Sequence, residues 1–127
     1  MAYEIPGRTI TLAASTDLSA AQFHFVGVAS DGRAELAILS TGDGNVLGVL
    51  QNKPTEDQAA SIMIDGVSKI VSQGSTLSAG DLVGNSTAGK ANVLASGDMI
   101  RGRIIYGSSG STGRVLTMVL QDIGSTG

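Results

Sequence analysis

The densest run of strand and turn signals lies between Asn45 and Val93, NVLGVLQNKPTEDQAASIMIDGVSKIVSQGSTLSAGDLVGNSTAGKANV. Three short apolar runs within it, Val46–Leu50, Ile62–Ile64 and Val67–Val71, are separated by polar residues and glycines. Short apolar runs bounded by Gly, Pro, Asn and Asp are typical of β-strands joined by turns. We therefore expect this stretch to form the centre of an all-β fold, with the other strands added around it.

The dipeptide Asp65-Gly66 separates two of these runs, Ser61–Ile64 and Val67–Val71. An Asp-Gly pair suits a two-residue turn because both residues tolerate a positive φ. The two runs therefore form either a tight hairpin or one long strand that bends at Gly66. The sequence favours the hairpin.

The chain begins with an extended arm at residues 1–7. Pro6 cannot donate a ladder hydrogen bond and directs Ile5 towards an extended conformation, and Gly7 follows it. Arg8–Ala13 then alternates between threonine and aliphatic residues, which predicts a half-buried strand.

A hairpin is expected between Phe23–Ala29 and Ala34–Leu39, because Asp31-Gly32 lies between these two runs. In the first run the two phenylalanines should share one face, with His24 on the other. A turn at residues 42–45 then leads into the strand at Val46.

The C-terminal part predicts a second hairpin. Met99–Tyr106 and Arg114–Leu120 both alternate, and Gly107–Gly113 between them forms a long, flexible tip. Alternation in the first strand separates two sets of side chains, one with Ile100, Ile104 and Tyr106 and the other with Arg101, Arg103 and Ile105.

These elements predict an all-β fold, a small β-sandwich or β-barrel of short antiparallel strands with an extended N-terminal arm. The length of 127 residues fits one domain, and 18 glycines suit many tight turns better than long helices. We expect the arm at residues 1–7, the β body at 8–123 and a flexible tail at 124–127.

Composition excludes several classes of function. Eight Lys and Arg against eleven Asp and Glu leave a net charge of −3, and no basic stripe indicates nucleic-acid binding. Without Cys there are no disulfides or thiolate metal sites. The apolar runs are far shorter than the ~20 residues that span a bilayer. The N-terminus, MAYEIPGRT, lacks the basic and apolar regions of a secretory signal, so we expect a cytosolic product.

Candidates for catalysis have ordinary structural explanations. His24 is the only histidine, and the sequence shows neither a nucleophile nor an orienting partner for it. Glu56 and Asp57 lie together in a polar loop, where both carboxylates would be solvated alike. The glycines at 107, 110 and 113 resemble a phosphate-binding loop, but a strand follows them where such a loop requires a helix.

Two further patterns also have ordinary structural explanations. Ser68 and Lys69 are neighbours in a predicted strand, so their side chains point to opposite faces and cannot act together. Four aspartates lie beside glycines but do not form a calcium loop, and we interpret them as turn residues: Asp43, Asp65, Asp81 and Asp98. We therefore expect neither an enzyme nor a bound metal or cofactor.

Residues Gly48–Ala91 carry a pattern in a fixed order. An apolar G-V-L-Q strand is followed by a polar Pro-containing loop, then by A-S-I-M-I-D-G-V-S-K-I-V, G-x-x-L-S-A-G-D-L-V and a short A-G-K-A turn. Over roughly a third of the chain this order resembles the small decoration, or cement, proteins of tailed-bacteriophage heads. The flanking residues match only as general β sequence.

The resemblance implies a structural virion protein on the outer surface of the capsid, made in the host cytoplasm, that binds the major capsid protein and bridges its subunits. It also implies a homo-oligomer, with a trimer favoured and a dimer next, and no nucleic-acid or membrane partner. Avidity from several modest contacts would then give tight binding. Tyr3, Ile5 and Pro6 are the expected contacts with the capsid or a neighbour, because they form an extended, apolar terminus outside the alternating strands.

Three alternatives stay open. A biotinyl or lipoyl carrier domain is also a small β-sandwich with G-D-x-V turns, as at Gly80–Val83, and Lys90 lies in a turn, but no internal repeat supports this reading. A sugar- or ligand-binding module normally uses aromatic platforms, and this chain has two Tyr, two Phe and no Trp. Another virion part, such as a tail component or fibre base, has the same composition.

Overall fold

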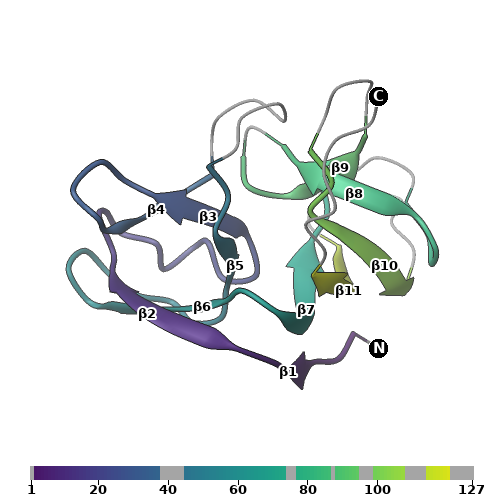
Figure 1. Cartoon of the computed structure of the whole chain (residues 1–127), viewed down its shortest axis with the longest axis horizontal. Helices are drawn as coiled ribbons and strands as arrows, with labels where there is room; N and C mark the ends of the chain where they lie inside the picture. Colours follow the sequence, from purple (N-terminus) through teal and green to yellow (C-terminus); the bar gives the residue numbers. More distant parts are fainter. Residues whose placement is uncertain are drawn as a thin grey trace.

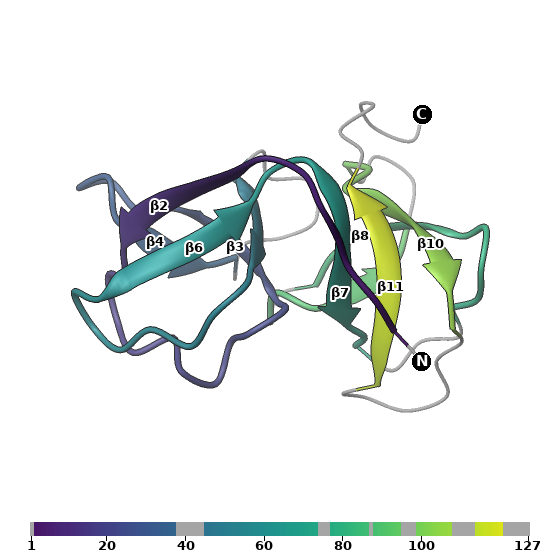
Figure 2. The ribbon, with the colours of Figure 1, turned by 90° about the horizontal axis from the view of Figure 1, so that it is seen from below.

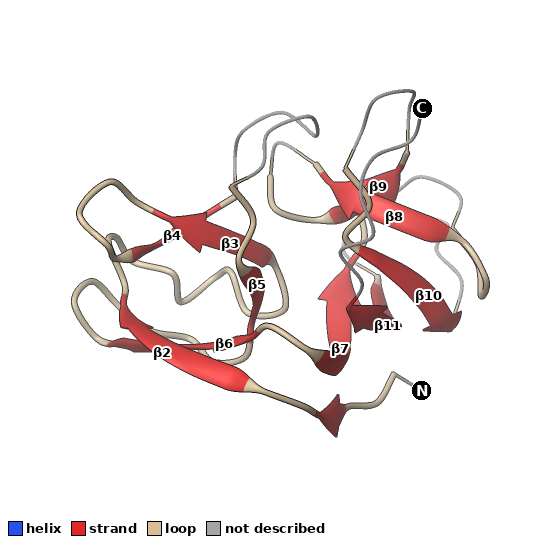
Figure 3. Ribbon diagram, viewed as in Figure 1, coloured by secondary structure: helices blue, strands red, loops and turns tan. Residues whose placement is uncertain are grey.

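The computed structural model describes residues 2–37, 45–73, 77–86, 88–94, 99–107 and 114–120. Eleven strands form within these ranges, all pairings between strands are antiparallel, and the described residues contain no helix (Figures 1 and 3). The strands belong to two sheets that share a core. The predicted all-β sandwich is confirmed.

The first sheet has five strands in the order β2-β6-β5-β3-β4. Its members are β2 (Thr9–Ala13), β3 (Phe25–Val28), β4 (Ala34–Leu36), β5 (Gly48–Leu50) and β6 (Ala59–Met63). The β3–β4 hairpin turns at Asp31-Gly32 as predicted, with Gly32 at φ +86°. Beyond β2, Ala14 forms a bridge with Ala34, so the sheet curls towards a barrel.

The second sheet has six strands in the order β1-β7-β11-β10-β8-β9. Its members are β1 (Ile5–Pro6), β7 (Gly66–Val71), β8 (Leu82–Asn85), β9 (Ala91–Val93), β10 (Gly102–Tyr106) and β11 (Val115–Leu120). The predicted β10–β11 hairpin is confirmed. Most of its tip, the turn at 42–44 and the tail at 124–127 lie outside the described residues.

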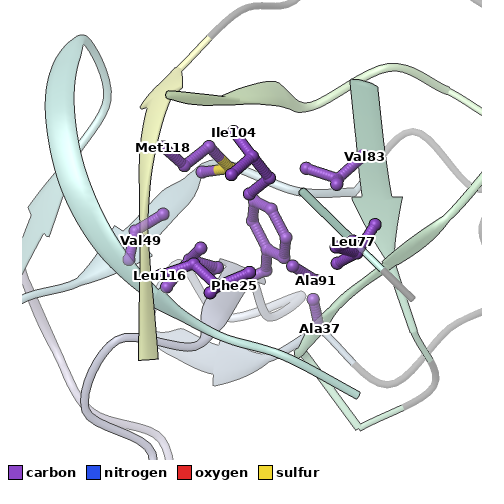
Figure 4. Packing of buried hydrophobic residues seen from close by; sticks show 10 residues of the cluster. Phe25, Ala37, Val49, Leu77, Val83, Ala91, Ile104, Leu116 and Met118 are labelled. Atoms are coloured by element: carbon purple, nitrogen blue, oxygen red, sulfur yellow. The ribbon is translucent and has the colours of Figure 1, made fainter. Parts of the chain in front are cut away.

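The main core lies between the two sheets (Figure 4). Phe25 from β3 and Val49 from β5 meet aliphatic side chains of the six-stranded sheet, and both are fully buried. Burying each such side chain contributes roughly 1.5–3 kcal/mol. The other members are Ala37, Ile70, Leu77, Val83, Ala91, Ile104, Leu116 and Met118.

A second core lies on the opposite face of the five-stranded sheet. Val26, Leu50 and Ile62 pack there against Leu18 and Ala21 of the loop before β3. β5 is therefore buried on both faces, as is most of β3. This double burial explains why Gly48–Leu50 is continuously apolar and shows no alternation.

Two chain segments pass side by side from one sheet into the other (Figure 2). β2 pairs with β6 and β1 with β7 in one continuous register, from Ala13 opposite Ala59 to Ile5 opposite Val67. We call residues 5–13 paired with 59–67 the crossing ribbon. β6 and β7 are thus one strand bent at Asp65-Gly66. The prediction of a tight hairpin at this position is wrong.

The bend depends on close approach of two glycines. A Cβ atom on Gly66, which has φ +119°, would lie 2.6 Å from the backbone nitrogen of Gly7. A Cβ atom on Gly7 would overlap the carbonyl oxygen of Asp65. Only residues without a side chain let the two segments cross between the sheets while staying paired.

Two predicted strands differ locally from expectation. Phe23 has φ +63° and lies in the turn before β3, because the preceding loop closes over the second core and Phe23 N–H donates to the Leu50 carbonyl at 2.7 Å. β10 contains a bulge between Ile104 and Tyr106, which brings Tyr106 to the solvent side. Arg101, which alternation grouped with Arg103 and Ile105, is buried, whereas Ile105 is exposed.

Candidate interaction surface

The N-terminal residues lie against the outer face of the six-stranded sheet. In β7 and β11 the side chains of Ser68, Ile70, Leu116 and Met118 are buried, and the alternate residues point outward. Ile5 lies opposite Val67 and Pro6 opposite Gly66, so β1 is the edge strand beside β7. The arm therefore has a place in the sheet, contrary to the expectation that it lies outside the strands.

Tyr3 is held on this face by one hydrogen bond and one ring contact. Its backbone N–H donates to Oγ1 of Thr117 at 2.9 Å. Its ring lies 5.9 Å from the ring of Tyr106, centroid to centroid, at an interplanar angle of 55°. Thr117 points outward yet is fully buried, so the arm covers it. Tilted aromatic pairs of this kind contribute about 0.5–1.5 kcal/mol beyond their buried area.

A charged pair borders the same face. Lys69 projects outward from β7, with Nζ 3.9 Å from Oε1 of Glu4 and 5.4 Å from the centroid of the Phe23 ring. Both charged side chains are about one-third exposed, so the ion pair adds little to stability. Because Glu4 follows Tyr3 in the arm, the pair brings both charges to the border of this face.

Four residues form what we call the tyrosine face. They are Tyr3, which is 41% exposed, Ile5 (58%), Tyr106 (45%) and Val115 (40%). Exposed aromatic and aliphatic residues on a rigid sheet, bordered by charge, are suited to contact with another protein surface. The sequence analysis proposed Tyr3 and Ile5 as contact residues and did not single out Tyr106 or Val115, because it grouped Tyr106 with Ile100 and Ile104 in a regular strand and did not show the bulge.

A cavity of about 310 Å³ lies at the junction of the sheets. Its lining includes the apolar residues Phe25, Ile64 and Leu120 and the cationic residues Arg8 and Arg101. Arg8 Nε lies 3.3 Å from Oδ2 of Asp65 in a largely exposed ion pair at the bend of the crossing ribbon. The space is large enough for a side chain of a partner, and no sequence pattern indicated it.

His24 is not arranged for catalysis. Nδ1 lies 3.0 Å from the carbonyl oxygen of Gln22, so this nitrogen carries the proton and donates. Burial lowers the pKa of His24 below its usual value, and the charge of Lys90 acts in the same direction, while hydrogen bonding to Gln22 opposes them. The imidazole is therefore neutral at pH 7 and acts as a hydrogen-bond donor to the turn.

The loop carboxylates differ from each other. Asp57 Oδ1 accepts a 2.6 Å hydrogen bond from Arg33 Nη1, and Arg33 also binds Asp31 at 2.8 Å. Asp57 stays mostly exposed and has φ +66°. Glu56 and Asp57 are both exposed, as expected for solvated loop charges, and the ion pair with Arg33 is an addition that the sequence did not indicate.

The remaining candidates behave as structural residues. Ser68 Oγ accepts from Gln51 Nε2 inside the core at 2.9 Å, whereas Lys69 points outward, so the two do not meet. Asp81 accepts from the N–H of Ser78 in a turn. The other predicted turn aspartates, Asp43 and Asp98, lie outside the described residues, as do Gly110 and Gly113.

Lys90 is not displayed at a free tip. The Ser86–Lys90 turn packs against β3, since Phe25 N–H donates to the carbonyl of Gly89 at 2.6 Å, and Lys90 is half-buried. Gly107 has φ +99° and precedes the tip before β11, so a strand does follow this glycine-rich segment.

The sequence matches no protein-family model and no curated protein. Among the residues that the structure describes, no three His, Cys, Asp or Glu side chains gather as metal ligands. In the same residues we find no helix with the length and apolar character needed to cross a bilayer.

Proposed function

We propose that this chain is a structural virion protein that binds the outer surface of a tailed-phage capsid and bridges major capsid protein subunits. The observation that carries the proposal is the ordered pattern in Gly48–Ala91 that resembles head decoration proteins. The protein would be made in the host cytoplasm and would act without catalysis as a small homo-oligomer, by analogy a trimer.

The tyrosine face is the surface that supports this proposal best. Its four residues come from three separate strands and the arm, so they are held on a rigid platform. Bridging proteins need such a platform because each ordered side chain then loses little conformational entropy on binding. Tyr3, Ile5 and Pro6 remain the proposed contacts, and Tyr106 and Val115 extend the same surface.

The test is binding of the purified protein to expanded capsids that lack it, followed by thermal unfolding of the capsids. We expect saturation at a copy number that the capsid symmetry allows, together with a raised capsid melting temperature. Absence of binding by a folded protein would contradict the proposal. Saturation on tails or fibre bases instead would establish the alternative virion role.

Matched variants locate the contact surface. Tyr3→Ala and Ile5→Ala each remove an exposed side chain of the tyrosine face, and we expect capsid affinity to fall at least about tenfold if they are central contacts. Val93→Ala is the control, because Val93 is 46% exposed on β9 at the opposite edge of the same sheet. Equal effects of all three variants would argue against the tyrosine face.

A further inference from the structure

The crossing ribbon has an outer edge whose backbone groups point away from the body. Ile64 N–H donates to the Arg8 carbonyl at 3.0 Å, and Ala14 N–H donates to the Gln58 carbonyl at 2.8 Å. Hydrogen-bonded pairs alternate along an antiparallel ladder. The backbone N–H and C=O groups of the even-numbered residues from Arg8 to Ala14 therefore point towards β6. Thr9 and Thr11 therefore direct both N–H and C=O outward, and both residues are exposed.

The other sheet edges among the described strands are partly covered. At the β4 edge, Ala34 bridges Ala14 and accepts from Ser15 N–H at 2.8 Å. This bridge also covers the ribbon edge just beyond β2, so the part of the ribbon edge clear of it runs from Gly7 to Thr11. At the β9 edge, Ala91 bridges Ser72 in the same way. The ribbon edge continues from β2 into β1 along both sheets (Figure 2), with Gly7 also exposed.

The β2 segment of this edge lacks the features that normally prevent strand pairing. Edge strands are usually interrupted by charged residues, Pro or bulges. Thr9–Ala13, with the sequence TITLA, contains no charge and no Pro, and its register with β6 is regular. Such an edge is ready to accept another strand.

We propose that this edge pairs antiparallel with the same edge of a second copy of the chain, about a two-fold axis at Thr9. A two-fold axis makes a surface complementary to itself. Thr9 then lies opposite Thr9 and Gly7 opposite Thr11, so the outward groups of all three residues find partners. Cross-strand threonine pairs are favourable.

Charge favours this register over the one shifted by one residue towards the N-terminus. With Thr9 on the axis, Arg8 lies opposite Ile10 of the other copy. A shift of the axis to Arg8 would place the two arginines directly opposite each other, and like charges in that position are destabilising. The contact does not depend on capsid binding, and its two-fold symmetry differs from the trimer expected by analogy.

The first test measures self-association of the purified full chain by sedimentation and light scattering. Thr11→Pro removes an outward N–H and leaves the ladder with β6 intact, so we expect the dimer dissociation constant to rise at least about tenfold. Thr11→Val keeps the N–H and should dimerise like the parent. A parent chain that stays monomeric, or a trimer that survives Thr11→Pro, would overturn the proposal.

The second test is independent of proline tolerance. The chain has no Cys, and opposite residues of a hydrogen-bonded pair are about 5.5 Å apart at Cα, within disulfide range. Thr9→Cys should therefore form a covalent dimer on mild oxidation, whereas Ser30→Cys, exposed in the β3–β4 turn, should not. Equal cross-linking of both variants would refute the contact. Dimerisation without capsid binding would refute only the proposed function.

Discussion

Gly66→Ala tests the central feature of the fold, the crossing ribbon. Gly66 has φ +119°, and an added Cβ would lie 2.6 Å from the nitrogen and 2.9 Å from the Cα of Gly7. Both of these atoms belong to the backbone, so no side chain can rotate away. Relief requires the two segments of the ribbon to move apart.

Two contributions set the expected loss of stability. A positive φ costs a residue with a Cβ about 1–2 kcal/mol, and forcing an extra methyl group into a packed site costs typically 1–3 kcal/mol. The free energy of unfolding should therefore fall by about 2–5 kcal/mol. Against the ~5–15 kcal/mol of an ordinary domain, this is a large fraction.

Urea unfolding of matched variants separates the two contributions. Gly32 and Gly80 have φ +86° and +98°, and a Cβ on either would meet nothing within 4 Å. Their alanine variants report the backbone conformation alone, about 1–2 kcal/mol. If Gly66→Ala lost no more stability than Gly32→Ala, the close approach in the ribbon would not constrain the fold, and the reasoning would fail.

Three further predictions concern the cores, the histidine and the arm. Phe25→Ala should lower the free energy of unfolding by about 3–5 kcal/mol in urea titrations, whereas Val28→Ala, at a 37% exposed position on the same strand, should cost under about 1 kcal/mol. Burial lowers the pKa of His24 in the folded protein, so below pH 6.5, the ordinary pKa of histidine, the unfolded chain binds more protons than the folded one. The free energy of unfolding should therefore fall from pH 7 towards pH 5. His24→Gln should flatten that decline in melting experiments at different pH values. Thr117→Val removes the acceptor of Tyr3 N–H, so it should cost about 1 kcal/mol and accelerate amide exchange at Tyr3.

Much of the fold could be predicted because it depends on local chemistry. Alternation marked β2 and β11, and Asp31-Gly32 marked the β3–β4 turn. Asp65-Gly66 has the same local chemistry but a different outcome. Residues 5–13 pair with both β6 and β7, the strands on either side of Asp65-Gly66, and hold them in separate sheets. The sequence around Asp65-Gly66 does not show that residues 5–13 are its partner.

The candidate surface was predicted only in part for a related reason. Tyr3 and Ile5 were recognisable as an apolar terminus. Tyr106 was grouped on one face with Ile100 and Ile104, which are buried, because alternation assumes a regular strand, and the bulge in β10 interrupts it before Tyr106. Alternation grouped Arg101 with Arg103 and Ile105 and gave no sign that Arg101 is buried beside the cavity.

The two cores pack against opposite faces of the five-stranded sheet. Phe25 and Val49 belong to the core on one face, and Val26 and Leu50 belong to the core on the other. The two sheets therefore cannot separate without exposing apolar surface of the five-stranded sheet. The crossing ribbon adds a backbone connection between the same two sheets. We therefore expect Phe25→Ala and Gly66→Ala to lower one cooperative unfolding transition, since each acts on a junction that both sheets share. A variant that melted one sheet first, with two resolved transitions, would show that the sheets fold independently and that the ribbon is only a linker.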